Sequence, residues 1–102
     1  MKLTWADGSG PGTTQALADE IEREGKLYAG SYVTRDDRRC LWGVINDWRM
    51  WDGNYARPDR HLSTESAAAF HQLGLTTAEN DNRFGSPEAR CKWAVEILRQ
   101  VP

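Results

Sequence analysis

The sequence predicts a mainly α-helical fold of the α+β class: a compact, single-domain helical bundle of four to five helices, with room for one small β-hairpin. Helix start and stop signals recur along the chain, and the segments between them repeat apolar residues at intervals of three and four. The chain has 102 residues, of which 39% are hydrophobic and 27% charged. This length and composition suit one globular domain with one core.

The chain begins with a segment that lacks any helix signal. The stretch "ADGSGPG" at residues 6–12 is rich in glycine, which favours turns and loops. We therefore expect residues 1–12 to be a flexible lead-in, and residues 13–102 to form the single globular helical domain.

The first helix is predicted from Thr13 or Thr14 to about Glu24. Either threonine can cap the N-terminus, because its hydroxyl can accept a hydrogen bond from a free backbone N–H of the first turn. Apolar residues four apart then share one face. Gly25 suits the left-handed position that commonly ends a helix.

The segment between Leu27 and Trp51 allows two predictions. Residues 27–33 are aromatic and β-branched enough for a strand, so "RDDR" could be a hairpin turn leading to a partner strand from Arg39. We favour the alternative, a helix that starts near Cys40 and is extended by Trp51. Its apolar stripe has the spacing i, i+3, i+4 and i+7, at Leu41, Val44, Ile45 and Trp48. Gly43 weakens this helix by about 1 kcal/mol relative to alanine.

The next segment is predicted to be a loop followed by a helix. Residues 52–59, "DGNYARPD", contain an Asp-Gly turn signal and a proline, which interrupts regular structure. Ser63 is a suitable cap for a helix that begins near Thr64 and stops at Gly74.

Two further helices are predicted near the C-terminus. Thr76 and Glu79 have the spacing of a capping box, which opens a short helix through about Arg83. Ser86 as N-cap and Pro87 as first helical residue open the last helix. Its apolar stripe consists of Cys91, Ala94, Leu98 and Val101.

Charge and composition exclude several classes of function. The net charge of −2 gives no global reason to bind nucleic acid or an anionic membrane. No stretch approaches the 18 or so apolar residues of a membrane span, and the start has no apolar leader, so we expect a cytoplasmic protein. The two cysteines and two histidines lack metal-ligand spacing, which predicts no metal and no cofactor. Cys40 and Cys91 are expected to be buried thiols.

The stretch "NDWRMWDGNYARPDRH" at residues 46–61 is the strongest candidate site. It contains Trp51, Tyr55, Arg57 and Arg60, and aromatic residues with arginine are the commonest anchors of protein–protein interfaces. The same residues suit stacking on single-stranded nucleic acid. However, three aspartates in the stretch offset the charge of its three arginines. The alternative is therefore a structured loop that covers the core, with the arginines and aspartates paired with each other.

A second candidate surface is acidic. Four carboxylates lie in the first predicted helix and could bind a basic partner as a mimic of nucleic acid. They are Asp19, Glu20, Glu22 and Glu24. The alternative is that they form an ordinary solvated helix face.

Two stretches resemble small bacterial and phage proteins of unknown function. "LADEIEREGKLYAGSYVTRDDRRCLWGVINDW" has their outline of E-x-G, then C-x-x-G, then an N-D pair, and "ENDNRFGSPEARCKWAVEILR" has their tail of N-D followed by P-E-x-R. The matching positions of the first are Glu24, Gly25, Cys40, Gly43, Asn46 and Asp47. The resemblance implies a phage or mobile-element accessory protein.

The main functional hypothesis is therefore a non-enzymatic phage or mobile-element protein that binds a host protein or complex and inhibits or redirects it, for example by blocking a host defence system. The alternative is a small nucleic-acid-binding regulator that uses the arginines and aromatic residues of segment 35–60. A third hypothesis, a thiol enzyme centred on Cys40, requires an accessible and activated sulfur.

Overall fold

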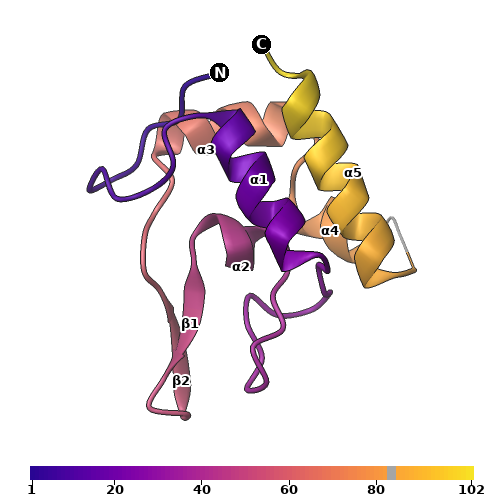
Figure 1. Ribbon diagram of the computed structural model, residues 1–102. Helices are drawn as coiled ribbons and strands as arrows, with labels where there is room; N and C mark the ends of the chain where they lie inside the picture. The colour runs from indigo at the N-terminus through magenta and orange to yellow at the C-terminus, as the bar shows by residue number, and fades with distance from the viewer. Residues whose placement is uncertain (83–84) are drawn as a thin grey trace.

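The computed structural model describes residues 1–82 and 85–102, and within them the chain forms a helical domain with one antiparallel hairpin (Figure 1). The prediction of a mainly α, α+β fold with one small hairpin is confirmed. The helices and strands are α1 (Thr14–Glu24), α2 (Leu41–Ile45), β1 (Trp48–Trp51), β2 (Tyr55–Pro58), α3 (Thr64–Gln72), α4 (Thr77–Asn82) and α5 (Pro87–Gln100).

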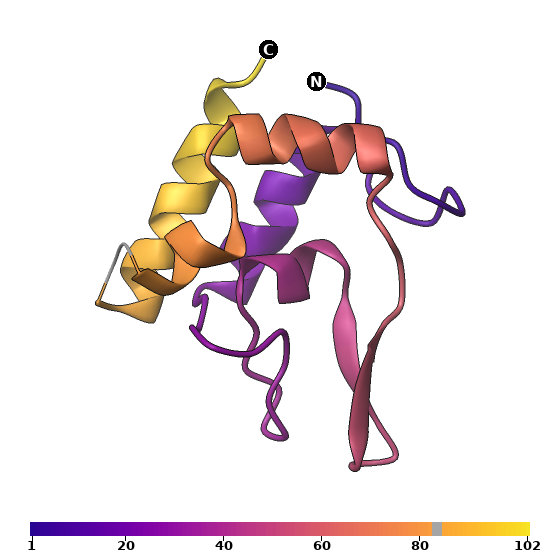
Figure 2. The same ribbon diagram turned by 180° about the vertical axis from the view of Figure 1, so that it is seen from behind.

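Helices α1 and α5 pack along each other, and α3 crosses near the start of α1 and the end of α5 (Figures 1 and 2). Leu17 and Ile21 of α1 and Leu98 of α5 are fully buried. Burial of each such side chain stabilises the fold by about 1.5–3 kcal/mol. The helical spacing of apolar residues therefore identified the correct faces.

The helix ends follow their local signals. The Thr13 hydroxyl accepts a hydrogen bond from the Ala16 N–H at 3.1 Å, and Gly25 ends α1 in the left-handed conformation with φ of 79°. Ser63 caps α3 and Ser86 caps α5 in the same way. The Thr76 hydroxyl accepts from the Glu79 N–H at the start of α4. The predicted end of that helix, Arg83, lies outside the described residues.

The predicted long helix after Cys40 is wrong beyond Ile45. Helix α2 is only five residues long, and the next residues turn through Asp47, whose φ of 52° is left-handed. The chain then forms β1, and residues 52–59, predicted to be a loop, contain the turn and β2. At the tip, Asp52 and Gly53 have φ of 48° and 83°. Because Trp51 pairs with Tyr55, the hairpin loop has three residues, 52–54, and the Asn54 N–H donates to the Trp51 carbonyl at 3.2 Å.

The alternative hairpin at residues 27–46 does not form two strands. Its residues make one isolated bridge, between Val33 and Arg39, around a tight turn closed by Thr34. This loop of residues 28–38 extends away from α3 in the same direction as the β1–β2 hairpin (Figure 2).

Residues 1–12, which were expected to be a flexible lead-in, contribute to the core. Leu3 and Trp5 are buried, and Trp5 bridges to Leu62 just before α3. Gly10 allows this packing because a Cβ at that position would lie 2.1 Å from the Trp5 ring. This segment and the domain that begins at residue 13 therefore share one core.

Among the described residues, no helix combines the length and the apolar character needed to cross a membrane.

Candidate functional site

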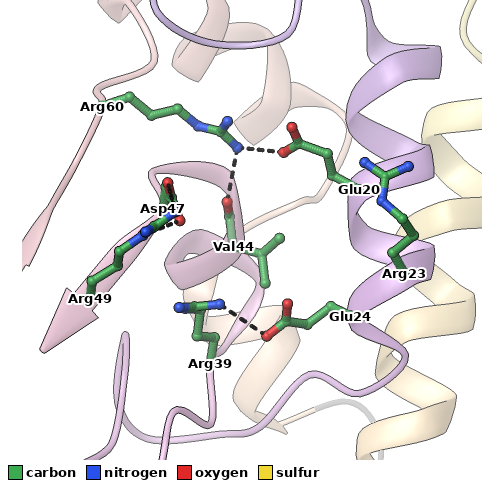
Figure 3. Close-up of a pocket in the computed structure, with 8 residues that line it drawn as sticks. All are labelled: Glu20, Arg23, Glu24, Arg39, Val44, Asp47, Arg49 and Arg60. Atoms are coloured by element: carbon green, nitrogen blue, oxygen red, sulfur yellow. Dashed lines mark hydrogen bonds and ion pairs between the residues drawn. The ribbon is translucent and has the colours of Figure 1, made fainter.

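The C-terminal end of α2 is tied to α1 by Arg60. The guanidinium of Arg60 donates hydrogen bonds to the Ile45 carbonyl at 2.8 Å and the Val44 carbonyl at 3.1 Å. The same group bonds the Glu20 carboxylate of α1 at 2.7 Å (Figure 3). The last carbonyls of a helix have no partner within the helix. An arginine from a distant segment satisfies them here and so ends the helix.

Arg39 makes the second connection to α1. Its Nε donates to the Trp48 carbonyl at 2.8 Å, and its Nη1 lies 3.3 Å from the Glu24 carboxylate (Figure 3). Glu20 and Glu24 are four residues apart, so they lie on one face of α1. The Arg39 and Arg60 side chains are only 16% and 11% exposed. These ion pairs are therefore less screened by water than surface pairs.

A charged cleft of about 280 Å³ lies between α1, the end of α2 and the start of the hairpin (Figure 3). Its lining consists of Glu20, Arg23, Glu24, Arg39, Val44, Asp47, Arg49 and Arg60. Because Arg39 and Arg60 already bind carboxylates and carbonyls, they hold the fold together and are not available to an anionic ligand.

Arg49 at the edge of the charged cleft is also paired. Its Nε and Nη2 donate to both oxygens of Asp47 at 3.2 and 3.0 Å, and Nε lies 3.2 Å from the Asp59 carboxylate. The hydrogen bond with Asp47 raises the pKa of the Arg49 guanidinium above its ordinary value. Arg49 is exposed but electrostatically compensated, so Arg23 is the one arginine of the charged cleft without a carboxylate partner among the described residues.

The hairpin presents two different faces because side chains alternate along a strand. Trp48, Met50, Ala56 and Pro58 are half-buried on one side. The opposite side is exposed, and we call it the outer face; it consists of Arg49, Trp51, Tyr55 and Arg57. The β1–β2 hairpin extends away from the helices (Figure 1).

Trp51, Tyr55 and Arg57 form one cluster on the outer face. Trp51 and Tyr55 are direct cross-strand partners and are 47% and 51% exposed. The Arg57 guanidinium lies 3.6 Å from the centroid of the Trp51 ring. This is a close cation–π contact, which holds two long side chains in one orientation. The structure therefore brings together three of the residues that were predicted as a partner-binding loop.

Arg60, the fourth residue of that predicted set, lies elsewhere. Its guanidinium is turned into the charged cleft and stacks over the Trp5 ring at 4.8 Å. The sequence could not reveal this, because the partners of Arg60 are distant in the chain.

Each of the four predicted acidic residues has an arginine partner. Asp19 and Glu22 lie 2.9 and 3.4 Å from Arg99 of α5. Glu20 and Glu24 pair with Arg60 and Arg39 as described above. The acidic face is thus a set of ion pairs that join α1 to its neighbours, and little uncompensated negative charge remains.

Sequence reasoning missed Arg49 as a member of the outer face. The signal that could have identified it is the alternation in "RMW" and "YAR", which places Arg49 and Arg57 opposite each other in the hairpin. A helical interpretation of the same residues hides this pattern.

The cysteines are buried free thiols, as predicted. Burial raises the pKa of Cys40 above its ordinary value, which keeps the thiol protonated and weakly nucleophilic. Among the described residues, no group of three or more His, Cys, Asp and Glu side chains is placed to hold a metal ion.

Comparisons of the chain with protein-family models, curated proteins and solved structures found no match.

Proposed function

We propose that this protein is a non-enzymatic binding protein that docks on a partner protein through the outer face of its hairpin. The observation that supports this proposal is the exposed cluster of Trp51, Tyr55 and Arg57. These three residue types dominate the energetics of protein–protein interfaces, because they combine large contact area with directional polar groups. Exposed aromatic rings on a projecting hairpin have no evident role in the core of this domain.

The charge of the outer face identifies the chemistry of the partner surface. Arg57 has no carboxylate partner among the described residues, and its guanidinium lies over the Trp51 ring. Arg49 is already paired with two aspartates. The partner surface should therefore offer an apolar recess for Trp51 and Tyr55 and a carboxylate for Arg57.

The hairpin is held in place before binding. An isolated two-stranded hairpin is marginally stable, but Trp48 at its base stacks on Tyr32 and its carbonyl accepts a hydrogen bond from Arg39. Less ordering is then needed on association, which favours affinity. In this proposal the arginines of the charged cleft fix the orientation of the outer face.

The resemblance to phage and bacterial proteins extends the proposal. In its extended form the partner is a host protein or complex in the cytoplasm, and binding inhibits or redirects it. This extension rests on the resemblance alone.

The alternative, a nucleic-acid-binding regulator, has less support. Of the arginines in segment 35–60, most have acidic partners: Arg38 pairs with Asp36, Arg39 with Glu24, Arg49 with Asp47 and Arg60 with Glu20. Only Arg35 and Arg57 lack a carboxylate partner among the described residues. Two free cations predict weak binding that nearly disappears at physiological salt.

The proposal is tested by affinity capture from the natural host with three variants. Trp51→Ala and Arg57→Ala remove the cluster, while Arg35→Ala removes an exposed arginine outside the hairpin. We expect one stoichiometric partner to be captured by the wild type and by Arg35→Ala, and at least tenfold less by either hairpin variant, which corresponds to a loss of about 1.4 kcal/mol or more.

Two results would contradict the proposal. Equal recovery by all four proteins would show that the outer face does not bind the partner. Recovery of nucleic acid that Arg35→Ala and Arg57→Ala reduce equally would favour the alternative. Because the substituted side chains are exposed, circular dichroism should show that every variant remains folded.

A further inference from the structure

A second cavity lies behind the hairpin and is distinct from the outer face. It has a volume of about 300 Å³, and its lining comes from the 28–38 loop, α2, β1, α3 and α4. We call it the aromatic pocket; its residues are Tyr32, Trp42, Asn46, Trp48, Ala67, His71 and Thr77. We propose that the aromatic pocket binds one neutral, planar aromatic ring.

The aromatic walls of this pocket are held in place by the surrounding structure. Trp42 is buried, its indole N–H donates to the Leu75 carbonyl at 3.0 Å, and its ring meets His71 edge-on at 5.8 Å. Trp48 stacks on Tyr32, with ring centroids 4.6 Å apart and planes 12° apart. Fixed aromatic rings favour a planar ligand, because offset-stacked and edge-to-face contacts form without reorganisation of the site.

The backbone of the 28–38 loop is pressed against α2, which fixes the position of Tyr32. Gly43 in α2 makes this possible, because a Cβ at residue 43 would lie 1.8 Å from the Tyr32 carbonyl oxygen. The exposed Tyr32 ring therefore stands at the pocket on a closely packed backbone rather than on a free loop. This packing is a second observation, independent of the ring contacts, that the aromatic pocket is preformed.

Size and charge identify the class of ligand. Small-molecule sites typically occupy roughly 300–1,000 Å³, so a cavity of about 300 Å³ admits one ring system and excludes a dinucleotide. The lining contains no Lys, Arg, Asp or Glu, so it offers no carboxylate to an ammonium group, and His71 is its one side chain that can carry a positive charge.

Two neutral polar groups at the aromatic pocket can orient the ligand. The Asn46 side-chain oxygen accepts from the Leu62 N–H at 3.0 Å, and its amide NH₂ has no partner among the described residues. Thr77 also lines the pocket and is exposed. A ring with one hydroxyl or N–H group, such as a phenol or an indole, would fit this arrangement.

The test is a titration with indole and p-cresol, followed by the indole N–H signals of the five tryptophans in two-dimensional NMR. We expect saturable shifts of the Trp42 and Trp48 signals, with a Kd on the order of 1 mM, as is reasonable for ligands with so few atoms. Benzylamine, which carries a positive charge on a ring of similar size, should bind at least tenfold more weakly, because the lining has no carboxylate to compensate its charge.

A matched pair of variants locates the binding. Ala67 is half-buried and lines the aromatic pocket, whereas Ala68 is exposed on the same helix. Both lie within α3, where leucine is tolerated. Ala67→Leu should fill the pocket and weaken indole binding at least tenfold, while Ala68→Leu should leave the affinity unchanged within twofold.

Aromatic rings occur both as free molecules and as side chains of proteins, and a capped amino acid distinguishes these sources. N-acetyl-tryptophanamide with an affinity similar to that of indole would indicate that the pocket accepts a side chain on a polypeptide. Binding of indole but not of the capped residue would indicate a free aromatic molecule. The proposal is overturned if no probe saturates the shifts at about 10 mM, or if the two alanine variants bind indole equally. These measurements do not involve the outer face, so their failure would leave the docking proposal unaffected.

Discussion

Replacement of Gly43 by alanine is the most informative test of the packing that orients the hairpin and the aromatic pocket. In an exposed helix this change would stabilise the protein by about 1 kcal/mol, because glycine is a poor helix former. In this structure the new Cβ would lie 1.8 Å from the Tyr32 carbonyl oxygen and 3.1 Å from the Arg39 Cβ. The backbone of the 28–38 loop must therefore move away from α2.

The magnitude follows from two opposing contributions. Relief of overpacking by backbone movement typically costs about 1–3 kcal/mol, and the upper value applies because the blocking atom belongs to the backbone. Subtracting the gain in helix propensity leaves a net destabilisation of about 2 kcal/mol. For a chain of this size that corresponds to a fall in Tm of about 10 °C.

The assay is thermal and urea unfolding of Gly43→Ala, with Gly12→Ala as the control. A Cβ at residue 12 meets no atom within 4 Å, so the control should unfold within a few degrees of the wild type. The variant should also lose the Tyr32–Trp48 stack, which near-ultraviolet circular dichroism reports. A Tm equal to or above that of the wild type would show that helix propensity dominates and that the loop does not press on α2.

Three further predictions concern stability. Arg60→Met should destabilise the fold by about 3 kcal/mol, because the Ile45 carbonyl and the Glu20 carboxylate lose their donor. Exposed Arg23→Met should stay within about 0.5 kcal/mol, and equal urea midpoints would refute the capping role of Arg60. Burial raises the pKa of Cys40 and Cys91 above the ordinary 9.0, so the thiols ionise at lower pH in the unfolded chain than in the folded protein. Their contribution to stability is therefore complete below pH 9 and is lost as the pH rises through the raised pKa values of the folded protein. The free energy of unfolding of the double variant Cys40→Ala, Cys91→Ala should then fall less steeply above pH 9 than that of the wild type. An equally steep fall would contradict this reasoning. Ser86→Ala should cost about 1 kcal/mol through loss of the N-cap, and an unchanged urea midpoint would argue against that cap.

The parts of the fold that the sequence predicted are those decided locally. A cap and the helix that it opens are separated by a few residues, so Thr13, Ser63 and Ser86 could be recognised directly. The end of α2 could not be recognised, because it depends on Arg60. Arg60 reaches back to the Val44 and Ile45 carbonyls from 15 or 16 residues further along the chain. The apolar stripe alone continued to Trp48 and misled the prediction.

The candidate site was predicted in part for the same reason. Trp51, Tyr55 and Arg57 are close in sequence and share the outer face of a tight hairpin, so a local pattern of aromatic residues and arginine found them. The acidic residues of α1 appeared as an open surface because their partners are remote: Arg99 is 80 positions from Asp19. The aromatic pocket assembles from five separate segments and leaves no local signal.

Hydrogen–deuterium exchange of the protein alone and in complex with its captured partner tests the central claim most directly. If the outer face is the docking surface, backbone amides of residues 48–58 should become protected on binding, while those of α1 and α5 exchange as in the free protein. Protection confined to α1 and α5, with the hairpin unchanged, would contradict this account.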